Sequence, residues 1–202
     1  MPDTVPDTMP DSVPDTMPER AAGPALGRLD AGWRSEYITA ATKEERRETA
    51  AGVGVADESR CVFCQLLSAH MNESLSDEQT LIVFRGETCV VILNKYPYSS
   101  GHFMVIPLRH VDDLTSLTDA EHLELWSLVR HGTTVIQRAY EADGINVGAN
   151  LGRAAGAGIP GHLHVHLVPR WNGDTNFMTT IAETRVMPES LHQTWSRLRA
   201  VW

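Results

Sequence analysis

The alternation of hydrophobic and polar positions predicts a small sheet in the middle of the chain. Two apolar, β-branched runs meet around Gly86 and Glu87, an arrangement typical of a hairpin. Three further runs are extended by the same criterion, and one of them ends at a proline. The predicted strands cover residues 80–86, 88–94, 102–107, 144–151 and 162–168.

Two helices are expected beside this sheet. Thr118 and Glu121 have the Thr-x-x-Glu spacing of a capping box, and the apolar residues behind them recur at helical spacing to about Ala142. A second helix is expected from about Glu189 to Val201. Hairpin strands combined with one long helix favour an α+β domain with a largely antiparallel sheet.

The first twenty residues have a different pattern, a degenerate tetrapeptide repeat that begins MPDT-VPDT-MPDS. Proline at every fourth position opposes both helix and sheet, and the repeat offers little apolar surface to bury. We therefore expect residues 1–22 to be a disordered tail and residues 23–60 to be an N-terminal arm. Residues 61–202 would form the folded domain with a C-terminal extension.

Composition and charge narrow the classes of partner. The 202 residues carry a net charge of −9, and the first twenty contain five acidic residues against one arginine. An acidic protein lacks the clustered Lys and Arg of a nonspecific nucleic-acid binder, but a few local donors can still hold a small phosphorylated ligand. The sequence has no apolar run of about 20 residues and no secretory signal at its start, so we expect a cytoplasmic protein without a membrane partner.

Three histidines alternate with aliphatic residues in the last predicted strand. Side chains two apart on a strand share a face, so His162, His164 and His166 are expected on one face. The opposite face, suited to packing on a helix, would carry Leu163, Val165 and Leu167. Three imidazoles on one face are compatible with a metal site, with nucleophilic catalysis at phosphorus, or with a polar sheet surface.

Cysteine spacing adds a candidate metal half-site. Cys61 and Cys64 form a Cys-x-x-Cys motif, which supplies two of the four ligands of many tetrahedral zinc sites. His110 and one of the strand histidines are candidates for the remaining ligands. A redox pair and two unrelated thiols are the alternatives. Cys89 lies within an apolar run and is expected to be a small core residue.

A glycine-rich loop precedes the histidines. Backbone N–H groups of such a loop can donate to phosphoryl oxygens, and Gly156 and Gly158 would let the backbone approach a ligand closely. A neutral imidazole can attack phosphorus if a second group fixes its tautomer. The loop and the histidines together indicate a nucleotide or phosphate site.

Several blocks of the sequence resemble the histidine triad (HIT) superfamily in order and spacing. The stretch HLHVHLV at 162–168 is similar to the signature in which three histidines alternate with hydrophobic residues. Within the superfamily, the chain looks most like the bacterial diadenosine tetraphosphate phosphorylase-like branch. The other matching blocks are GWRSEYI at 32–38, CVFC at 61–64, LNKYPYSSGHFMVIPLRH at 93–110, INVGANLG at 145–152 and PRWNGDTNF at 169–177.

This resemblance implies a HIT-like fold with a five-stranded sheet and a division of labour among the histidines. His164 would be the nucleophile, which attacks an α-phosphate and forms a nucleotidyl-histidine intermediate. His166 would contact phosphate and help hold the geometry. A structural Zn²⁺ would be bound by Cys61, Cys64, His110 and His162.

The resemblance also implies ligand contacts and an oligomer. Asn94, Asn146 and Asn150 match positions associated with ribose or phosphate. Family members form homodimers through the long helix and an adjoining strand. One departure concerns the loop, because Ala157 and Gly158 stand where many family hydrolases have side-chain donors, so backbone amides or Arg153 would have to bind phosphate.

The expected activity is phosphorolysis or hydrolysis of diadenosine tetraphosphate. Hydrolysis of a nucleoside phosphoramidate uses the same chemistry and stays an alternative. A non-catalytic nucleotide-binding module is the alternative from a different class, although pure binding does not need a nucleophile.

Overall fold

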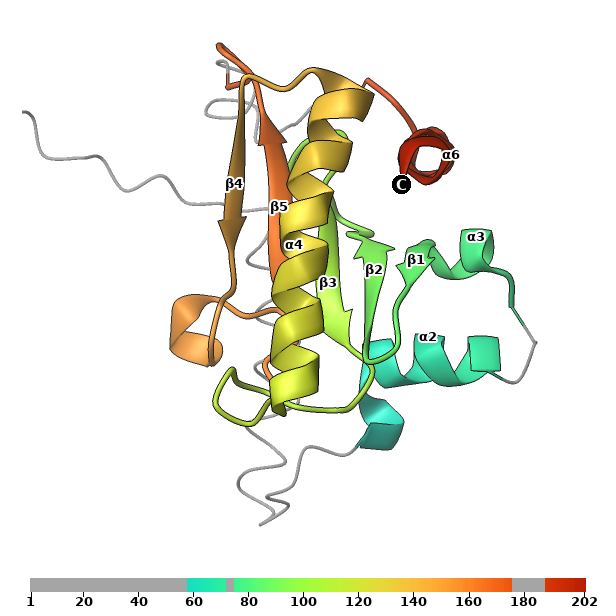
Figure 1. The fold of residues 1–202 in the computed structure, drawn as a ribbon, viewed down its shortest axis with the longest axis vertical. Coiled ribbons are helices and arrows are strands. Elements are labelled where there is room, and N and C mark those ends of the chain that lie inside the picture. The colour runs from blue at the N-terminus through green and yellow to red at the C-terminus, as the bar shows by residue number, and fades with distance from the viewer. Residues whose placement is uncertain (1–57, 72–74, 176–187) are drawn as a thin grey trace, which may run out of the picture. The chain divides into compact units, whose positions relative to one another are not determined.

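A five-stranded antiparallel sheet forms the centre of the molecule, as the alternating pattern predicts (Figure 1). The computed structural model describes residues 58–71, 75–175 and 188–202, all of which belong to one compact unit. The predicted α+β class is confirmed. In spatial order the strands are β1 (Ile82–Arg85), β2 (Cys89–Leu93), β3 (Phe103–Pro107), β5 (Val165–Arg170) and β4 (Gly144–Gly148).

The two expected helices are present, with small changes at their ends. α4 (Asp119–Tyr140) begins at the predicted capping box, in which Thr118 and Glu121 bond reciprocally. It ends two residues early because Glu141 adopts a left-handed conformation, with φ of 47°. α6 (Leu191–Val201) begins at a second capping box on Ser190.

Shorter elements were not predicted from the sequence. The main one is α2 (Val62–Met71), which starts within the Cys-x-x-Cys motif. It is preceded by the 3₁₀ turn η1 (Glu58–Arg60) and followed by α3 (Asp77–Thr80), and the glycine-rich loop contains the 3₁₀ turn η2 (Arg153–Ala155).

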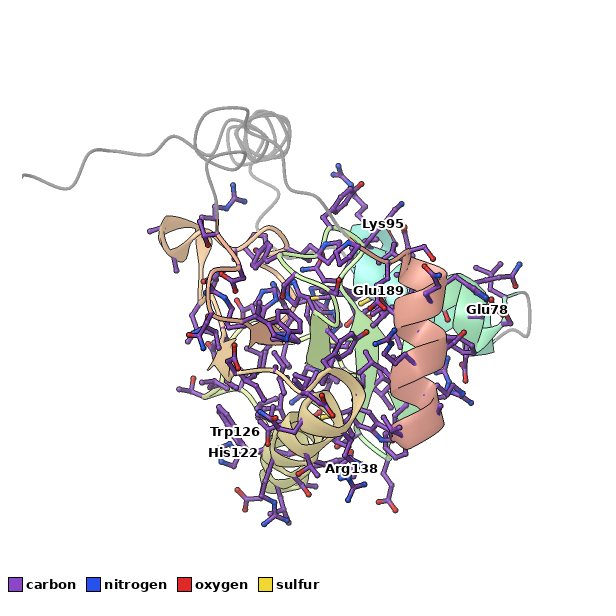
Figure 2. All side chains as sticks on the ribbon, turned by 90° about the horizontal axis from the view of Figure 1, so that it is seen from above. Glu78, Lys95, His122, Trp126, Arg138 and Glu189 are labelled. Carbon is purple, nitrogen blue, oxygen red and sulfur yellow. The ribbon has the colours of Figure 1, made fainter. Side chains whose placement is uncertain are left out.

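Both faces of the sheet are covered, and strand alternation decides which residues lie on each face. Figure 2 shows α4 on one side of the sheet and α2 on the other. The larger core lies between the sheet and α4 with α6, and it includes Phe103 and Leu167. A smaller core lies against α2 and includes Met104, which pairs with His166 across β3 and β5. The histidines therefore belong to the α2 face.

The two edges of the sheet differ. α6 covers the β1 edge, where Trp195 Nε1 donates to the carbonyl oxygen of Ile82 at 2.8 Å. Arg199 donates to the carbonyl oxygen of Val83 at 2.9 Å. None of the described elements pairs with the outer edge of β4.

The predicted histidine strand begins later than expected. β5 starts at Val165, so His162 and His164 precede it. Pairing with β3 begins at Val105 opposite Val165, and the N–H of Leu163 donates at 2.5 Å to Val111, beyond the end of β3. The prediction of one continuous strand over 162–168 was therefore wrong, although His164 and His166 remain neighbours.

The predicted tail and arm fall almost entirely on residues that the structure does not describe. The predicted tail, residues 1–22, lies outside the described residues, as do all but the last three residues of the predicted arm, 23–60. Within the described part of the chain, no helix combines the length and the apolar character needed to cross a bilayer.

Candidate functional site

Four predicted metal ligands meet beside the N-terminal end of α2. The ligand atoms of Cys61, Cys64, His110 and His162 all lie within 4.8 Å of one another. Nδ1 of His162 is 3.4 Å from Sγ of Cys61 and 3.5 Å from Sγ of Cys64. Nδ1 of His110 is 3.3 Å from Sγ of Cys64. A tetrahedral Zn²⁺ with bonds of about 2.3 Å to sulfur and about 2.0 Å to nitrogen would separate neighbouring sulfur and nitrogen atoms by about 3.5 Å, so these side chains fit such an ion.

The tautomer of His162 favours metal binding. Its Nε2 lies 2.9 Å from the carbonyl oxygen of Pro107, which can only accept, so the proton resides on Nε2. The lone pair of Nδ1 therefore faces the two thiols. Burial lowers the pKa of His162, which keeps the ring neutral, as a metal ligand requires.

A cation bound between Cys61 and Cys64 would also stabilise the thiolate forms of these two cysteines. Burial, followed by repulsion from the nearby Cys61 thiolate, raises the pKa of Cys64 to about 12. Two adjacent thiolates without a counter-ion are unfavourable, and a divalent cation reverses this penalty by binding the deprotonated form. His110 turns its Nδ1 towards Cys64, so this nitrogen is the one placed to bind a cation there.

His164 has the proton arrangement of a nucleophile. Its Nδ1 is 2.7 Å from the carbonyl oxygen of His162, so Nδ1 carries the proton and Nε2 keeps a lone pair. The side chain is buried, and this burial lowers its pKa even though the hydrogen bond to the carbonyl acts in the opposite direction. The ring is therefore neutral near pH 7. His162 therefore has two roles. Its side chain faces the two cysteines, and its backbone carbonyl orients the ring of His164.

His166 is held by a histidine that the sequence analysis did not select. The N–H of Tyr98 donates to Nδ1 of His102 at 3.0 Å, so the proton of a neutral His102 must be on Nε2. That Nε2 is 2.9 Å from Nδ1 of His166, which therefore accepts. His166 then carries its own proton on Nε2 and presents a donor suited to an anionic oxygen. His102 is almost fully buried and acts through His166.

Aromatic rings pack around both histidines. Phe63, within the Cys-x-x-Cys motif, lies 5.4 Å from His162 and 5.6 Å from His164 between ring centroids. The rings of His164 and His166 are 5.0 Å apart. The motif that supplies two thiols therefore also supplies a wall of the histidine site.

The predicted nucleotide contacts are distributed unevenly. Asn94 lies beside the histidines, with Nδ2 at a long 3.4 Å from Nε2 of His102 and Oδ1 accepting from the N–H of Tyr96. Asn146 lies on β4, where its Oδ1 accepts from Arg170 at 2.9 Å, so its amide is engaged away from the histidines. Asn150 is half-buried after β4.

The glycine-rich loop returns to the cluster of cysteines and histidines. Gly156 ends η2 with φ of 85°, a conformation that favours glycine. Gly158 is half-buried, and Ile159 packs against the smaller core near Cys61. The predicted loop glycines therefore lie on the segment leading into His162, and the N–H of Gly156 already donates to the carbonyl oxygen of Arg153 at 2.9 Å.

His102 could have been found from strand register. His102, Met104 and Ile106 alternate along one run, so they share a face in the sequence pattern. Which strand lies beside that run is set only in the fold, where Met104 pairs with His166. Tyr98 had no such signal, because it lies in a loop.

Comparisons with known proteins agree with this arrangement. The model of the HIT domain family matches residues 76–173. The AP-4-A phosphorylase of Mycobacterium tuberculosis (strain ATCC 25618 / H37Rv) is 46% identical over 128 residues, which is 63% of this chain and 66% of that protein. The chain thus spans just under two thirds of the length of this relative. The asymmetrical bis(5'-nucleosyl)-tetraphosphatase of Schizosaccharomyces pombe is 36% identical over 46% of this chain and 50% of its own length.

Solved structures extend the match over more of the chain. A Zn-bound histidine triad family protein from Mycobacterium smegmatis has a TM-score of 0.56 and 28% identity, over 71% of this chain and 94% of its own. A hypothetical histidine triad nucleotide-binding protein from Sulfolobus tokodaii strain7 has a TM-score of 0.54 and 31% identity, over 68% and 91%. The match to the family model and the 31% identity to a histidine triad protein that this chain covers to 91% show that this chain belongs to the histidine triad (HIT) family.

Proposed function

We propose that this protein is an enzyme that transfers a nucleotidyl group from diadenosine tetraphosphate through an intermediate on His164. The observation that carries the proposal is the 2.7 Å bond from His164 Nδ1–H to the carbonyl oxygen of His162, because it leaves the Nε2 lone pair for attack. Membership in the HIT family and 46% identity to a protein named AP-4-A phosphorylase support the choice of substrate.

The reaction follows from the two proton positions. Nε2 of His164 attacks the α-phosphorus; a P–N bond forms, and the P–O bond to the leaving ATP breaks. We assign to Nε2–H of His166 the hydrogen bond to the phosphoryl oxygens, with His102 as the residue that holds this tautomer. An oxygen of inorganic phosphate then attacks the adenylyl group, the P–N bond breaks, and ADP leaves. With water as acceptor, the second product is AMP.

Phosphate binding is assigned mainly to backbone. The loop offers no side-chain hydroxyl at Ala157 or Gly158, so the amide of Gly158 would donate to the phosphoryl oxygens, and Gly156 would do so only by giving up its bond to the carbonyl oxygen of Arg153. Asn94, beside His102, and Asn150 are proposed contacts to ribose or phosphate. The bond from Arg170 makes Asn146 the weakest of the proposed contacts.

Product analysis tests this function. Wild-type protein supplied with diadenosine tetraphosphate should give ADP and ATP only when inorganic phosphate is present, whereas AMP and ATP would identify a hydrolase. His164→Ala should reduce turnover by about 10⁴-fold or more while nucleotide binding persists. An adenylyl-protein adduct trapped by denaturant at alkaline pH, where a P–N bond to histidine is stable, should disappear in the same variant. No turnover on dinucleoside polyphosphates or phosphoramidates would favour the binding module instead.

We further propose that the cysteine and histidine cluster binds a structural Zn²⁺. The separations of 3.3–3.5 Å and the Nε2 proton of His162 support this assignment. When bound, the ion would stabilise the two thiolates and fix the segment that carries the His162 carbonyl. Elemental analysis of purified protein should give about one zinc per chain.

A homodimer is proposed from the exposed side of α4 and β4. Leu123 on α4 is 75% exposed and Trp126 is 40% exposed, and Figure 2 shows Trp126 on the outward side of the helix. Val147 on β4 is 43% exposed beside the open sheet edge. An apolar patch next to an open edge suits pairing with a second copy. Sedimentation analysis should show a dimer that Trp126→Glu dissociates.

The remaining assignments concern the whole chain. We propose that residues 61–202 form the HIT domain with its extension, preceded by the arm and the repeat tail. We also propose a cytoplasmic location and no nucleic-acid partner, in view of the net charge of −9. Cell fractionation and a nucleic-acid binding assay at physiological salt test these points.

A further inference from the structure

A cavity of about 970 Å³ lies beside the histidine site. It is bounded by the loop 98–100, the end of α4, the turn after β5 and the N-terminal half of α6. Its size falls within the range of pockets that bind small ligands, roughly 300–1,000 Å³. The proposed chemistry at His164 does not use this cavity, which raises the question of what it binds.

The walls of the cavity suit a flat aromatic ring. Tyr98, Tyr140 and Trp171 line it, and the rings of Tyr140 and Trp171 are 6.2 Å apart at 74°. Tyr140 is held in place, because its hydroxyl donates to Glu189 at 2.5 Å and the Arg197 guanidinium lies 5.2 Å from its ring centre. Immobilised aromatic side chains are good stacking surfaces for a nucleobase, since little entropy is lost on binding.

The charges around the cavity favour a neutral ligand. Glu189 pairs with Arg197 at 3.4 Å, and Asp174 accepts two bonds from Arg170. His192 contacts the carboxylate of Glu78 on α3. The carboxylates and the guanidinium that line the cavity are therefore already paired with opposite charges among the described residues, and His192 already contacts a carboxylate. A phosphate would have to break one of these pairs, whereas a nucleoside would not.

Uncharged polar groups supply the specificity that a base and ribose need. The hydroxyl oxygen of Ser100 is buried and has no hydrogen-bond partner among the described residues. This oxygen has essentially no solvent-accessible surface, so it does not face the open cavity, and the amide side chains are the uncharged polar groups that a ligand could reach. The side chains of Asn172 and Gln193 line the cavity. The Oε1 of Gln193 accepts from Ser190, so Gln193 offers its amide N–H groups, whereas the amide of Asn172 can both donate to and accept from a nucleobase edge.

One residue connects the cavity to the histidines. The ring of Tyr98 lines the cavity and stacks on His166, with centroids 5.9 Å apart and planes 30° apart. It is also 4.6 Å from the ring of His102. The ring of Tyr98 therefore separates the cavity from His166, the residue assigned to the phosphoryl oxygens.

We propose that this cavity is a subsite for a neutral nucleoside moiety. In a dinucleoside tetraphosphate attacked at one α-phosphate, the distal adenosine lies three phosphates away, and it would occupy the cavity after the chain passes Tyr98. This source of the ligand rests on the proposed function. A separate nucleoside bound next to Tyr98 is the second source, and it has the same chemistry.

The first arm of the test compares two substrates that differ only in the distal nucleoside. Ser196 lines the cavity from the exposed side of α6, so Ser196→Phe should fill it without disturbing the core. We expect the KM for diadenosine tetraphosphate to rise about tenfold, with little change for adenosine 5′-tetraphosphate. Ala200→Phe, one helical turn further along α6, is the matched control and should change neither KM.

The second arm measures binding of free adenosine to the full chain by NMR or calorimetry. Binding that Ser196→Phe abolishes and Ala200→Phe preserves, together with unchanged KM values for both substrates, assigns the cavity to a separate nucleoside. The same binding in a protein that turns over neither substrate would refute the proposed function but retain the subsite. If Ser196→Phe affects neither the dinucleotide KM nor adenosine binding, or affects both substrates equally, the subsite is refuted.

Discussion

The two faces of the sheet are built from the same strands but bury different chemistry. On the α4 face, Phe103, Val105 and Leu167 pack into one large apolar core. On the α2 face, Met104 and Ile106 form a smaller core, and next to it lie the cysteines and the histidines of the site. Successive residues of β3 and β5 thus point in turn to the apolar core on the α4 face and to the candidate site on the α2 face.

This difference has a physical basis in the neighbours of each face. The 22 residues of α4 supply a long apolar stripe, so the facing positions can be aliphatic throughout. α2 has only ten residues, and the rest of its face is closed by side chains that bond to one another or, as proposed, to a metal ion. Substitutions on the α4 face should mainly change unfolding, and those on the α2 face should also change metal content or turnover.

The largest effect on stability is expected from Phe103→Ala on the α4 face. Phe103 is completely buried, and its ring lies against Gly132 of α4, where even an added Cβ would come within 2.8 Å. Loss of this ring should lower the free energy of unfolding by about 3–5 kcal/mol, measured by urea denaturation. Zinc content should stay near one per folded chain. Leu108→Ala, at a more exposed position, is the control and should cost far less.

A smaller loss, accompanied by loss of metal, is expected from Cys61→Ser on the α2 face. The variant removes one proposed ligand, and at zinc concentrations about 100-fold above the dissociation constant the lost binding corresponds to about 3 kcal/mol of unfolding free energy. Cys89→Ala, a thiol substitution in the other core, should retain zinc. Full zinc occupancy in Cys61→Ser would rule out the four-ligand site.

The smallest of the three effects, and the one that depends most on pH, is expected from Glu121→Gln at the start of α4. The bond from Arg109, assisted by Thr118, lowers the pKa of this buried carboxylate to about 2. Because the folded-state pKa is depressed, the stabilisation is present above about pH 4.5 and is lost as the pH falls towards 2. The variant should cost about 1–3 kcal/mol at pH 7.

Unfolding measured at intervals from pH 7 to 2 should show that cost shrinking towards zero as the wild-type carboxylate becomes protonated. Asp112→Asn, on the exposed loop before α4, provides the comparison and should show a small difference throughout. A cost that stays constant with pH would contradict the assigned role of Glu121.

The sequence predicted best those parts of the fold whose determinants are local. Strand alternation identified the five strands, and the Thr118–Glu121 spacing located the start of α4. α2 was missed because its ten residues carry no capping signal and their apolar pattern is too short to distinguish from a loop. The start of β5 was misplaced because its ladder with β3 stops at Val105 opposite Val165, although β3 continues to Pro107, and this pairing is set only in the tertiary structure.

The same distinction applies to the candidate site. The Cys-x-x-Cys spacing and the alternation of histidines indicated metal ligands and a nucleophile from short stretches of sequence. His102 and Tyr98 lie more than 60 residues from His166 along the chain, and only the pairing of β3 with β5 brings them to it. The cavity beside Tyr98 is lined from four separate segments, so no single motif could reveal it.

The bonds from α6 to β1 have a consequence for assembly. Trp195 and Arg199 occupy carbonyl groups that an added strand would otherwise use, so β4 has the one open edge among the described strands. If two copies join through their β4 strands about a twofold axis, both β4 edges become paired. The two outer edges of the combined sheet are then β1 strands, each covered by α6. Polymerisation by edge addition would therefore stop at two chains, and a substitution that frees the β1 edge would create a molecule able to form fibres.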